Sequence, residues 1–417
     1  MRERPQPKSE GSGWLFLPSA YMLLFSLRFT EVFWVLFLLR NKGLSLAAIG
    51  FLETVFHISS LCSEMPTGII ADRWGRKVSL AVGRGIAAVS AALILYAKNW
   101  WVLSAAFVLN AISYTCHSGA FEALVYDSGP AEARSQFAKV LGNLNSVCLV
   151  GTALAGLAAT LMSRSSLELL YKASVVTDVV ATAVACLLVE DVRRLRQQKQ
   201  SETVWTGLRT DLQNLLSALK QPALFWLLLL WGIGSAMGTS VRFYGQAFLE
   251  ESRVPLFIIG LTGTASNLLA VIPTRAAHNL PRRYGQARPL IVGSFGIPAI
   301  VVLLALLPGQ SGLLPRVFIV AGYLGLTVVL ETLYPLMSES VNRLVSSDNR
   351  ATVLSSGEML FSLAMMAIFP FIGFLGDRLG LRWGLGMAAV GAALAMVSPS
   401  RRLSRFLGEK PPAYDGS

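Results

Sequence analysis

The feature that most constrains this chain is a series of apolar runs, each long enough to cross a lipid bilayer. Crossing the hydrocarbon core takes about 20 residues of helix. Six runs begin near Trp14, Ala47, Val78, Trp100, Gln136 and Leu167, and six more begin near Ala223, Leu256, Pro289, Pro315, Thr352 and Trp383. This pattern predicts an all-α membrane protein with twelve transmembrane helices in two six-helix bundles.

The composition supports a surface that faces lipid. Charged residues make up 14% of the chain and hydrophobic residues 53%, whereas a soluble domain carries roughly 25% charged residues. The net charge of +12 would suggest nucleic acid in a soluble protein, but here we expect the bases to orient membrane loops, so nucleic acid is not an expected partner. The four cysteines lie in apolar runs without metal-binding spacing, so no metal site is expected.

The apolar runs also set the expected domain boundaries. We expect a cytoplasmic tail, a first bundle, a linker, a second bundle and a second cytoplasmic tail, at residues 1–13, 14–190, 191–222, 223–400 and 401–417. Apolar residues recur at helical spacing from Val204 to Leu219, which predicts an amphipathic helix on the membrane surface within the linker. The first run is too long for a signal peptide, so it should remain as the first span.

The distribution of positive charge predicts the orientation. Most of the 36 lysines and arginines fall in alternate loops, which become cytoplasmic when both termini are placed in the cytoplasm. Cytoplasmic loops carry an excess of these residues, so this orientation is the expected one. The segment "GIIADRWGRK", Gly68–Lys77, then lies in the cytoplasm between the second and third helices.

This segment carries a motif. Its fixed positions spell G-x-x-x-D-R-x-G-R-K and are Gly68, Asp72, Arg73, Gly75, Arg76 and Lys77. The motif resembles the signature loop of the major facilitator superfamily, in the place where that family has it. The resemblance, to a twelve-helix bacterial type, covers nearly the whole chain and implies inverted triple-helix repeats. It implies that Asp72 caps helix eleven while the cytoplasmic side is closed, and that Arg76 pairs with Asp127 at the inner end of helix four.

The residue chemistry agrees with this interpretation. Gly68 would let a neighbouring helix approach closely, and Gly75 would permit a tight turn. Asp72 would gain from the dipole and free N–H groups of a helix N-terminus. The alternative is a simple turn whose bases only obey the positive-inside rule. A second copy of the motif, "GFLGDRLGLR" at Gly373–Arg382, falls on the outer side, as inverted repeats predict.

Ionisable residues inside spans are costly, so each needs a reason. Arg28 and Glu31 are three residues apart, and on one helix they would share a face near its middle. We expect either a proton-binding carboxylate held by an arginine or a static ion pair. Three further proton-coupling candidates are His57, Glu122 and Glu331, although a histidine in a span is often only a hydrogen-bond donor. Asp178 lies mid-span on helix six, and the sequence offers no partner for it.

The family resemblance implies that helices one, four, seven and ten line a substrate cavity. Candidate lining residues are Asn110 on helix four and Arg242, Tyr244 and Gln246 near the outer end of helix seven. Aromatic residues on these helices could also form walls of the cavity, whereas most others are expected to contact lipid or neighbouring helices.

These features predict a secondary transporter that works by alternating access. The chain has no Walker motif, so an ion gradient should drive it, and the buried acids favour protons. The leading hypothesis is efflux of an amphipathic or cationic small molecule by proton antiport. The alternatives are import of an anionic or zwitterionic nutrient by proton symport, and movement of a lysolipid. The helix-five antiporter signature is not matched by "GTALAGLAAT".

The same features predict what surrounds the protein. We expect a monomer in contact with membrane lipid in the cytoplasmic (inner) membrane, with no cofactor. An enzyme is not expected, because the chain has no nucleophile elbow, no HExxH motif and no clustered metal ligands.

Overall fold

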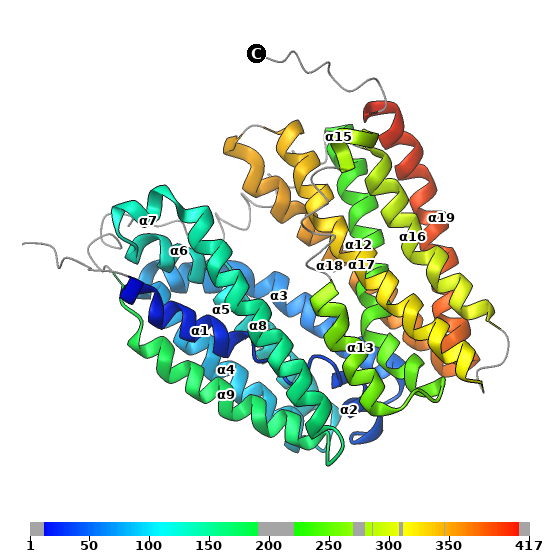
Figure 1. The fold of residues 1–417 in the computed structure, drawn as a ribbon, viewed down its shortest axis with the longest axis horizontal. Coiled ribbons are helices and arrows are strands. Elements are labelled where there is room, and N and C mark those ends of the chain that lie inside the picture. Colours follow the sequence, from blue (N-terminus) through cyan, green and yellow to red (C-terminus); the bar gives the residue numbers. More distant parts are fainter. Residues whose placement is uncertain are drawn as a thin grey trace, which may run out of the picture. The chain divides into compact units, whose positions relative to one another are not determined.

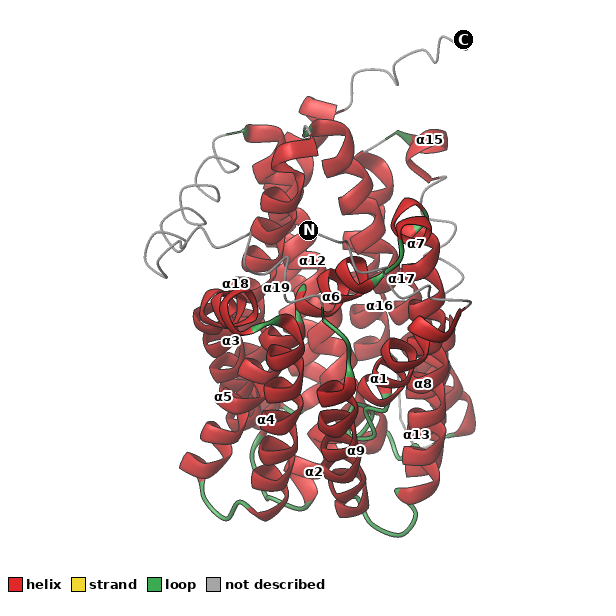
Figure 2. Cartoon of the chain, turned by 90° about the vertical axis from the view of Figure 1, so that its left-hand side faces the viewer, coloured by secondary structure: helices red, strands yellow, loops and turns green. Residues whose placement is uncertain are grey.

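The structure is a computed structural model that describes residues 12–190, 221–269, 280–285, 287–307, 312–345 and 347–407. It is all-helical across these residues (Figure 2). The predicted amphipathic linker helix lies outside the described residues. The chain divides into two compact units. One comprises Met1–Thr30, Cys62–Ala159 and Glu168–Val204, and the other comprises Glu31–Leu61, Thr160–Leu167 and Trp205–Ser417.

Helices of the first sequence half build the first unit. They are η1 (Ser12–Leu15), α1 (Phe16–Ser26), α4 (Arg76–Tyr96), α5 (Trp100–His117), α6 (Ala120–Ser128), α7 (Ala131–Ser135) and α9 (Glu168–Leu187), with parts of α3 (Leu46–Trp74) and α8 (Phe137–Met162). Helix α4 packs against both α5 and α9 (Figure 1). Tyr21 of α1, Phe121 of α6 and Leu144 of α8 belong to one buried core cluster.

The second unit is built around one buried helix. Its elements are α2 (Trp34–Arg40), the first part of α3, α12 (Pro222–Glu251), α13 (Leu256–Leu269), α15 (Leu280–Tyr284), α16 (Ala287–Leu306), α17 (Leu313–Leu344), α18 (Ser347–Leu379) and α19 (Leu381–Leu407). Helix α12 packs against α16, α17, α18 and α19. Its side chains are therefore mostly buried, including Leu227, Trp231 and Tyr244.

The helix lengths agree with a membrane protein. In the described part of the chain, nine helices are long and apolar enough to cross a membrane: α3, α4, α8, α9, α12, α16, α17, α18 and α19. Two shorter apolar helices, Gly13–Ser26 and Leu256–Leu269, lie where the first and eighth spans are expected. Helix α5 occupies the fourth predicted span. The predicted all-α membrane fold is confirmed.

The first predicted span is not a continuous helix, and this corrects the sequence interpretation. Helix α1 ends at Ser26 and α2 begins only at Trp34. Non-helical backbone at membrane depth needs hydrogen-bond partners. Gln246 of α12 supplies them, because its amide nitrogen donates to the Glu31 carbonyl at 3.0 Å and its amide oxygen accepts from the Val35 N–H at 3.3 Å.

Candidate functional site

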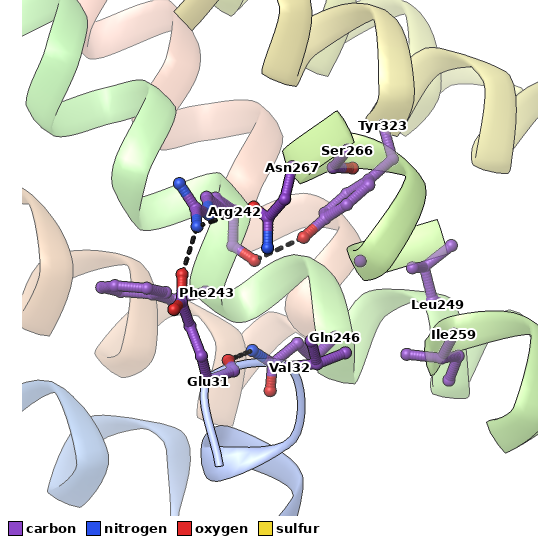
Figure 3. Close-up of a pocket in the computed structure, with 11 residues that line it drawn as sticks. Glu31, Val32, Arg242, Phe243, Gln246, Leu249, Ile259, Ser266, Asn267 and Tyr323 are labelled. Carbon is purple, nitrogen blue, oxygen red and sulfur yellow. Dashed lines mark hydrogen bonds and ion pairs between the residues drawn. The ribbon is translucent and has the colours of Figure 1, made fainter. Parts of the chain in front are cut away.

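Arg242 is the centre of a charged cluster within the second unit. Its guanidinium contacts the carboxylate of Glu31, donates to the Glu331 carboxylate at 3.1 Å, and donates to the side-chain oxygen of Asn267 at 3.2 Å. Figure 3 shows Arg242 pointing toward Glu31 beside Asn267. We call Glu31, Arg242, Asn267 and Glu331 the Arg242 cluster. Its members come from α12, α13, α17 and the turn before α2.

Small residues on α12 explain why α17 comes close enough to complete the cluster. Gly238 and Gly245 lie one turn before and one turn after Arg242, on the same helix face. A side chain at Gly245 would collide with the ring of Tyr323, and one at Gly238 would collide with Leu330. Close approach of two helices through glycine is typical of membrane proteins. The approach brings Tyr323 within reach, and its hydroxyl donates to the Arg242 carbonyl at 2.8 Å.

The charges of the Arg242 cluster do not balance. One guanidinium faces two carboxylates, so the cluster carries one net negative charge when all three groups are ionised. Each side chain is about one quarter to one third exposed. An unbalanced charge in a membrane-spanning region is costly, so binding of one proton or one cation would be favourable there.

A small cavity adjoins the cluster. Its volume is about 20 Å³, and its lining includes Glu31, Arg242, Asn267 and Tyr323. A space of this size holds about one water molecule. The predicted lining residue Gln246 also borders it. In this conformation the described cavity therefore admits a water molecule, and an organic cation would reach the cluster only if the surrounding helices moved apart.

The other predicted lining residues lie elsewhere. Tyr244 is fully buried and does not line this small cavity, so its place in a substrate cavity stays a prediction. Its ring stacks on Phe369 with centroids 4.2 Å apart, and its hydroxyl donates to the Leu46 carbonyl at 2.8 Å. Asn110 is exposed on α5 of the first unit. The proton-coupling candidate Glu122 is exposed on α6.

The signature loop forms the turn between α3 and α4. Gly75 has φ +106°, which favours glycine. Arg76 contacts the Asp127 carboxylate and donates to the Ala123 carbonyl at 2.9 Å. The structure thus brings Arg76 and Asp127 together, as the resemblance implies. Sequence reasoning missed Glu190, whose carboxylate accepts from the backbone N–H of Arg76 at 2.7 Å and caps α4.

Lys77 also donates its backbone N–H to the Glu190 carboxylate, at 3.1 Å, whereas the contacts of the described residues give no such partner to Gly68, Asp72 or Arg73. Asp72 and Arg73 are exposed at the end of α3. A side chain at Gly68 would meet no described atom within 4 Å. The capping of helix eleven by Asp72 and the close helix approach at Gly68 stay predictions.

The second copy of the motif also makes a helix cap. Asp377, at the end of α18, accepts from the backbone N–H groups of Leu46 and Ala47, each at 2.9 Å. These are the first residues of α3, so the carboxylate satisfies free donors at a helix N-terminus. The backbones approach closely at this point, because a side chain at Gly373 would collide with the Leu46 carbonyl.

Three charged residues from the sequence analysis have partners that the sequence did not suggest. Arg28 lies outside any helix, exposed, with its guanidinium 4.7 Å from the centre of the Phe25 ring. Glu31 pairs with Arg242 and not with Arg28, which corrects the prediction. The reason is the interruption of the helix, which removes the shared face. Asp178 accepts from Arg84 of α4 at 2.8 Å. Arg84 lies in the third predicted span, and a charged residue in a span was the signal that could have identified it as the partner of Asp178.

Comparisons with known proteins agree with this fold. The model of the Major Facilitator Superfamily matches residues 17–364. Over 89 residues, 21% of the chain, the sequence is 30% identical to the uncharacterized MFS-type transporter YxaM of Bacillus subtilis (strain 168). That match spans only 22% of the relative's length.

Solved transporter structures have the same fold at low sequence identity. A mutant of the nucleoside transporter NupG has a TM-score of 0.78 and 14% identity, over 93% of this chain and 99% of that one. A D-xylose-proton symporter has a TM-score of 0.70 and 14% identity, over 93% and 98%. A bacterial homologue of the human lysosomal transporter Spinster has a TM-score of 0.68 and 16% identity, over 97% and 100%. The chain therefore belongs to the major facilitator superfamily of transporters and is an integral membrane protein.

Proposed function

We propose that this transporter exchanges protons for an amphipathic or cationic small molecule, which it moves out of the cytoplasm across the inner membrane. Both termini lie in the cytoplasm in this proposal, as the positive charge of the loops favours. The observation that carries the proposal is the charge imbalance of the Arg242 cluster, where one arginine contacts two carboxylates.

This imbalance gives a physical basis for exchange. A net charge of minus one is neutralised either by a proton on Glu31 or Glu331 or by a nearby cation. Binding of one therefore disfavours binding of the other, because the second positive charge would have no negative charge left to neutralise. Competition between a proton and a cationic substrate for one negative charge is the thermodynamic basis of antiport.

Import of an anionic nutrient is the second candidate. It needs a cation that is available to the anion, and Arg242 already contacts two carboxylates. Arg28 supports this candidate, because it is exposed and the ion pairs of the described residues do not include it. No described contact favours a lysolipid over these two classes.

We assign closure of the cytoplasmic side to the signature loop. In this proposal Arg76 and Asp127 hold the turn between α3 and α4, and Asp72 caps helix eleven while that side is closed. The contact between Arg76 and Asp127 supports the first part. The matching cap that Asp377 makes on α3 supports the second part by analogy, because the two motifs are copies of each other.

The test uses proteoliposomes with an acidic lumen and a pH-sensitive dye inside. Lipophilic cations such as tetraphenylphosphonium, added outside, should raise the luminal pH as protons leave in exchange. The matched control is the Glu31→Gln variant at equal protein content. Absence of alkalinisation across a panel of cations, combined with acid-driven uptake of organic anions, would instead establish the import alternative.

A further inference from the structure

A second pair of titratable side chains lies on α3, apart from the Arg242 cluster. Glu53 and His57 are four residues apart, so they share one face of the helix. Their side chains are only 10% and 9% exposed. The imidazole Nε2 lies 3.7 Å from the Glu53 carboxylate. Two buried titratable groups inside a predicted span are costly to keep without a function.

Within the described part of the chain, the groups that contact this region of α3 are neutral or acidic. From α12, the hydroxyl of Tyr244 lies beside Gly50, one turn before Glu53. From α18, the ring of Phe361 meets His57 edge-on at 5.9 Å, and Asp377 binds the start of α3. Among the described residues, the ion pair of Glu53 is the one with His57.

A buried carboxylate without a strong cationic partner is costly in free energy, and so is a buried imidazolium. One proton shared by the two side chains lowers this cost, because the carboxylic acid and the neutral imidazole carry no charge. We propose that Glu53 and His57 form a proton-binding site that holds one proton while α3 is packed against α12 and α18.

The contacts that hold α3 against α12 and α18 lie one to two helical turns before Glu53, toward the N-terminus of α3. Asp377 caps the start of α3, and the Tyr244 hydroxyl donates to the Leu46 carbonyl. A side chain at Gly50 would collide with the backbone of Pro370, so α3 and α18 are in close contact there. When α3 separates from α12 and α18, the pair meets water and ionisation no longer requires burial of a charge. Separation therefore releases the proton.

This inference does not rest on the proposed exchange with a cation, and its test needs no substrate. The full chain is reconstituted in lipid, and infrared difference spectra are recorded between acidic and alkaline pH. A neutral carboxylic acid in a dry environment gives a separate C=O stretching band. We expect a band that disappears on alkalinisation and that is absent from the Glu53→Gln variant.

The matched control is Glu168→Gln, because Glu168 and Lys172 form the same type of pair, four residues apart, with both side chains about half exposed. This variant and Glu31→Gln should both keep the band. Persistence of the full band in folded Glu53→Gln protein would overturn the proposal. If Glu53→Gln does not fold, Glu53→Asp serves instead, since a displaced carboxyl must move the band, and an unmoved band overturns the assignment.

The link to helix packing has its own measurement. The Asp377→Asn variant weakens the cap on α3 and should lower the pH at which half of the band is lost, because water then reaches the pair more often. The His57→Asn variant should also shift this pH. A static pair with no link to packing predicts an unchanged titration in Asp377→Asn, and that result would overturn the link.

Discussion

The Arg242 cluster and the pair formed by Arg84 and Asp178 place arginine beside carboxylate in two different ways. In the first unit, Arg84 meets one carboxylate, Asp178, at 2.8 Å, and also donates to the Ser113 hydroxyl at 3.2 Å. In the second unit, Arg242 meets two carboxylates. The pair of Arg84 and Asp178 has no net charge when both groups are ionised. The Arg242 cluster has a net charge of minus one in the same state, so it becomes neutral only when a positive charge is added.

This difference in net charge distinguishes a structural ion pair from a site that can bind a proton or a cation. A neutral buried pair gains nothing from an added proton, which would leave the arginine unbalanced. The Arg242 cluster becomes neutral when it gains one positive charge, so it can respond to pH or to a cation. This comparison accounts for Asp178 as a structural partner of Arg84, and it places the coupling hypothesis on Glu31 and Glu331.

The largest expected effect comes from breaking the neutral pair. Arg84→Leu leaves Asp178 buried without a cation, which should lower the free energy of unfolding by about 3–5 kcal/mol. Thermal unfolding in detergent checks this through a clear fall of the midpoint. The double variant Arg84→Leu/Asp178→Leu should regain most of the loss and keep transport with a normal pH profile. A double variant that folds but has lost pH dependence would contradict a purely structural role.

The next effect concerns the unbalanced cluster. Glu31→Gln leaves Arg242 with one carboxylate, so the cluster becomes neutral and no longer needs a proton. We expect the transport rate to fall about tenfold or more, equivalent to about 1.4 kcal/mol or more, and to lose its dependence on pH. Initial rates measured over a pH series check this, with the Arg84→Leu/Asp178→Leu variant as control. An unchanged pH profile would exclude Glu31 as a coupling residue.

A smaller effect is expected at the signature loop. Asp72→Asn should leave the protein in the membrane while weakening the proposed cap by about 0.5–2 kcal/mol. Transport should fall several-fold, because the state closed to the cytoplasm becomes less populated. Substrate transport at matched protein levels is the measurement, and Glu168→Gln, at an exposed acidic position outside the motif, is the control. Wild-type transport by Asp72→Asn would argue for the simple-turn alternative.

The smallest effect tests an exposed pair. Glu168 and Lys172 have the spacing of a helix ion pair but are about half exposed. Glu168→Gln should change the free energy of unfolding by about 1 kcal/mol or less and leave transport unchanged. A large loss of stability would show that exposure is a poor guide to the importance of an ion pair here, and would weaken the comparison between Arg84 and Arg242.

Of the candidate functional residues, those in local motifs were the easiest to predict from the sequence. Arg76, Gly75 and Asp127 could be identified because their spacing repeats a family pattern, and a tight turn with a glycine needs few distant contacts. The partner of Glu31 could not be read in this way. Assuming an unbroken helix placed Glu31 beside Arg28, whereas the break in that helix is supported by Gln246, more than 200 residues away.

The sequence by itself determined the class of the protein. Apolar runs of spanning length, a biased distribution of arginine and lysine, and one loop motif were enough for an all-α membrane transporter, because solvation by lipid acts on each segment separately. Only the tertiary structure decided which charges meet. Side chains from four separate segments form the Arg242 cluster, and helix packing through Gly238 and Gly245 brings them together. Such contacts depend on which helix faces converge, and a single sequence does not encode that locally.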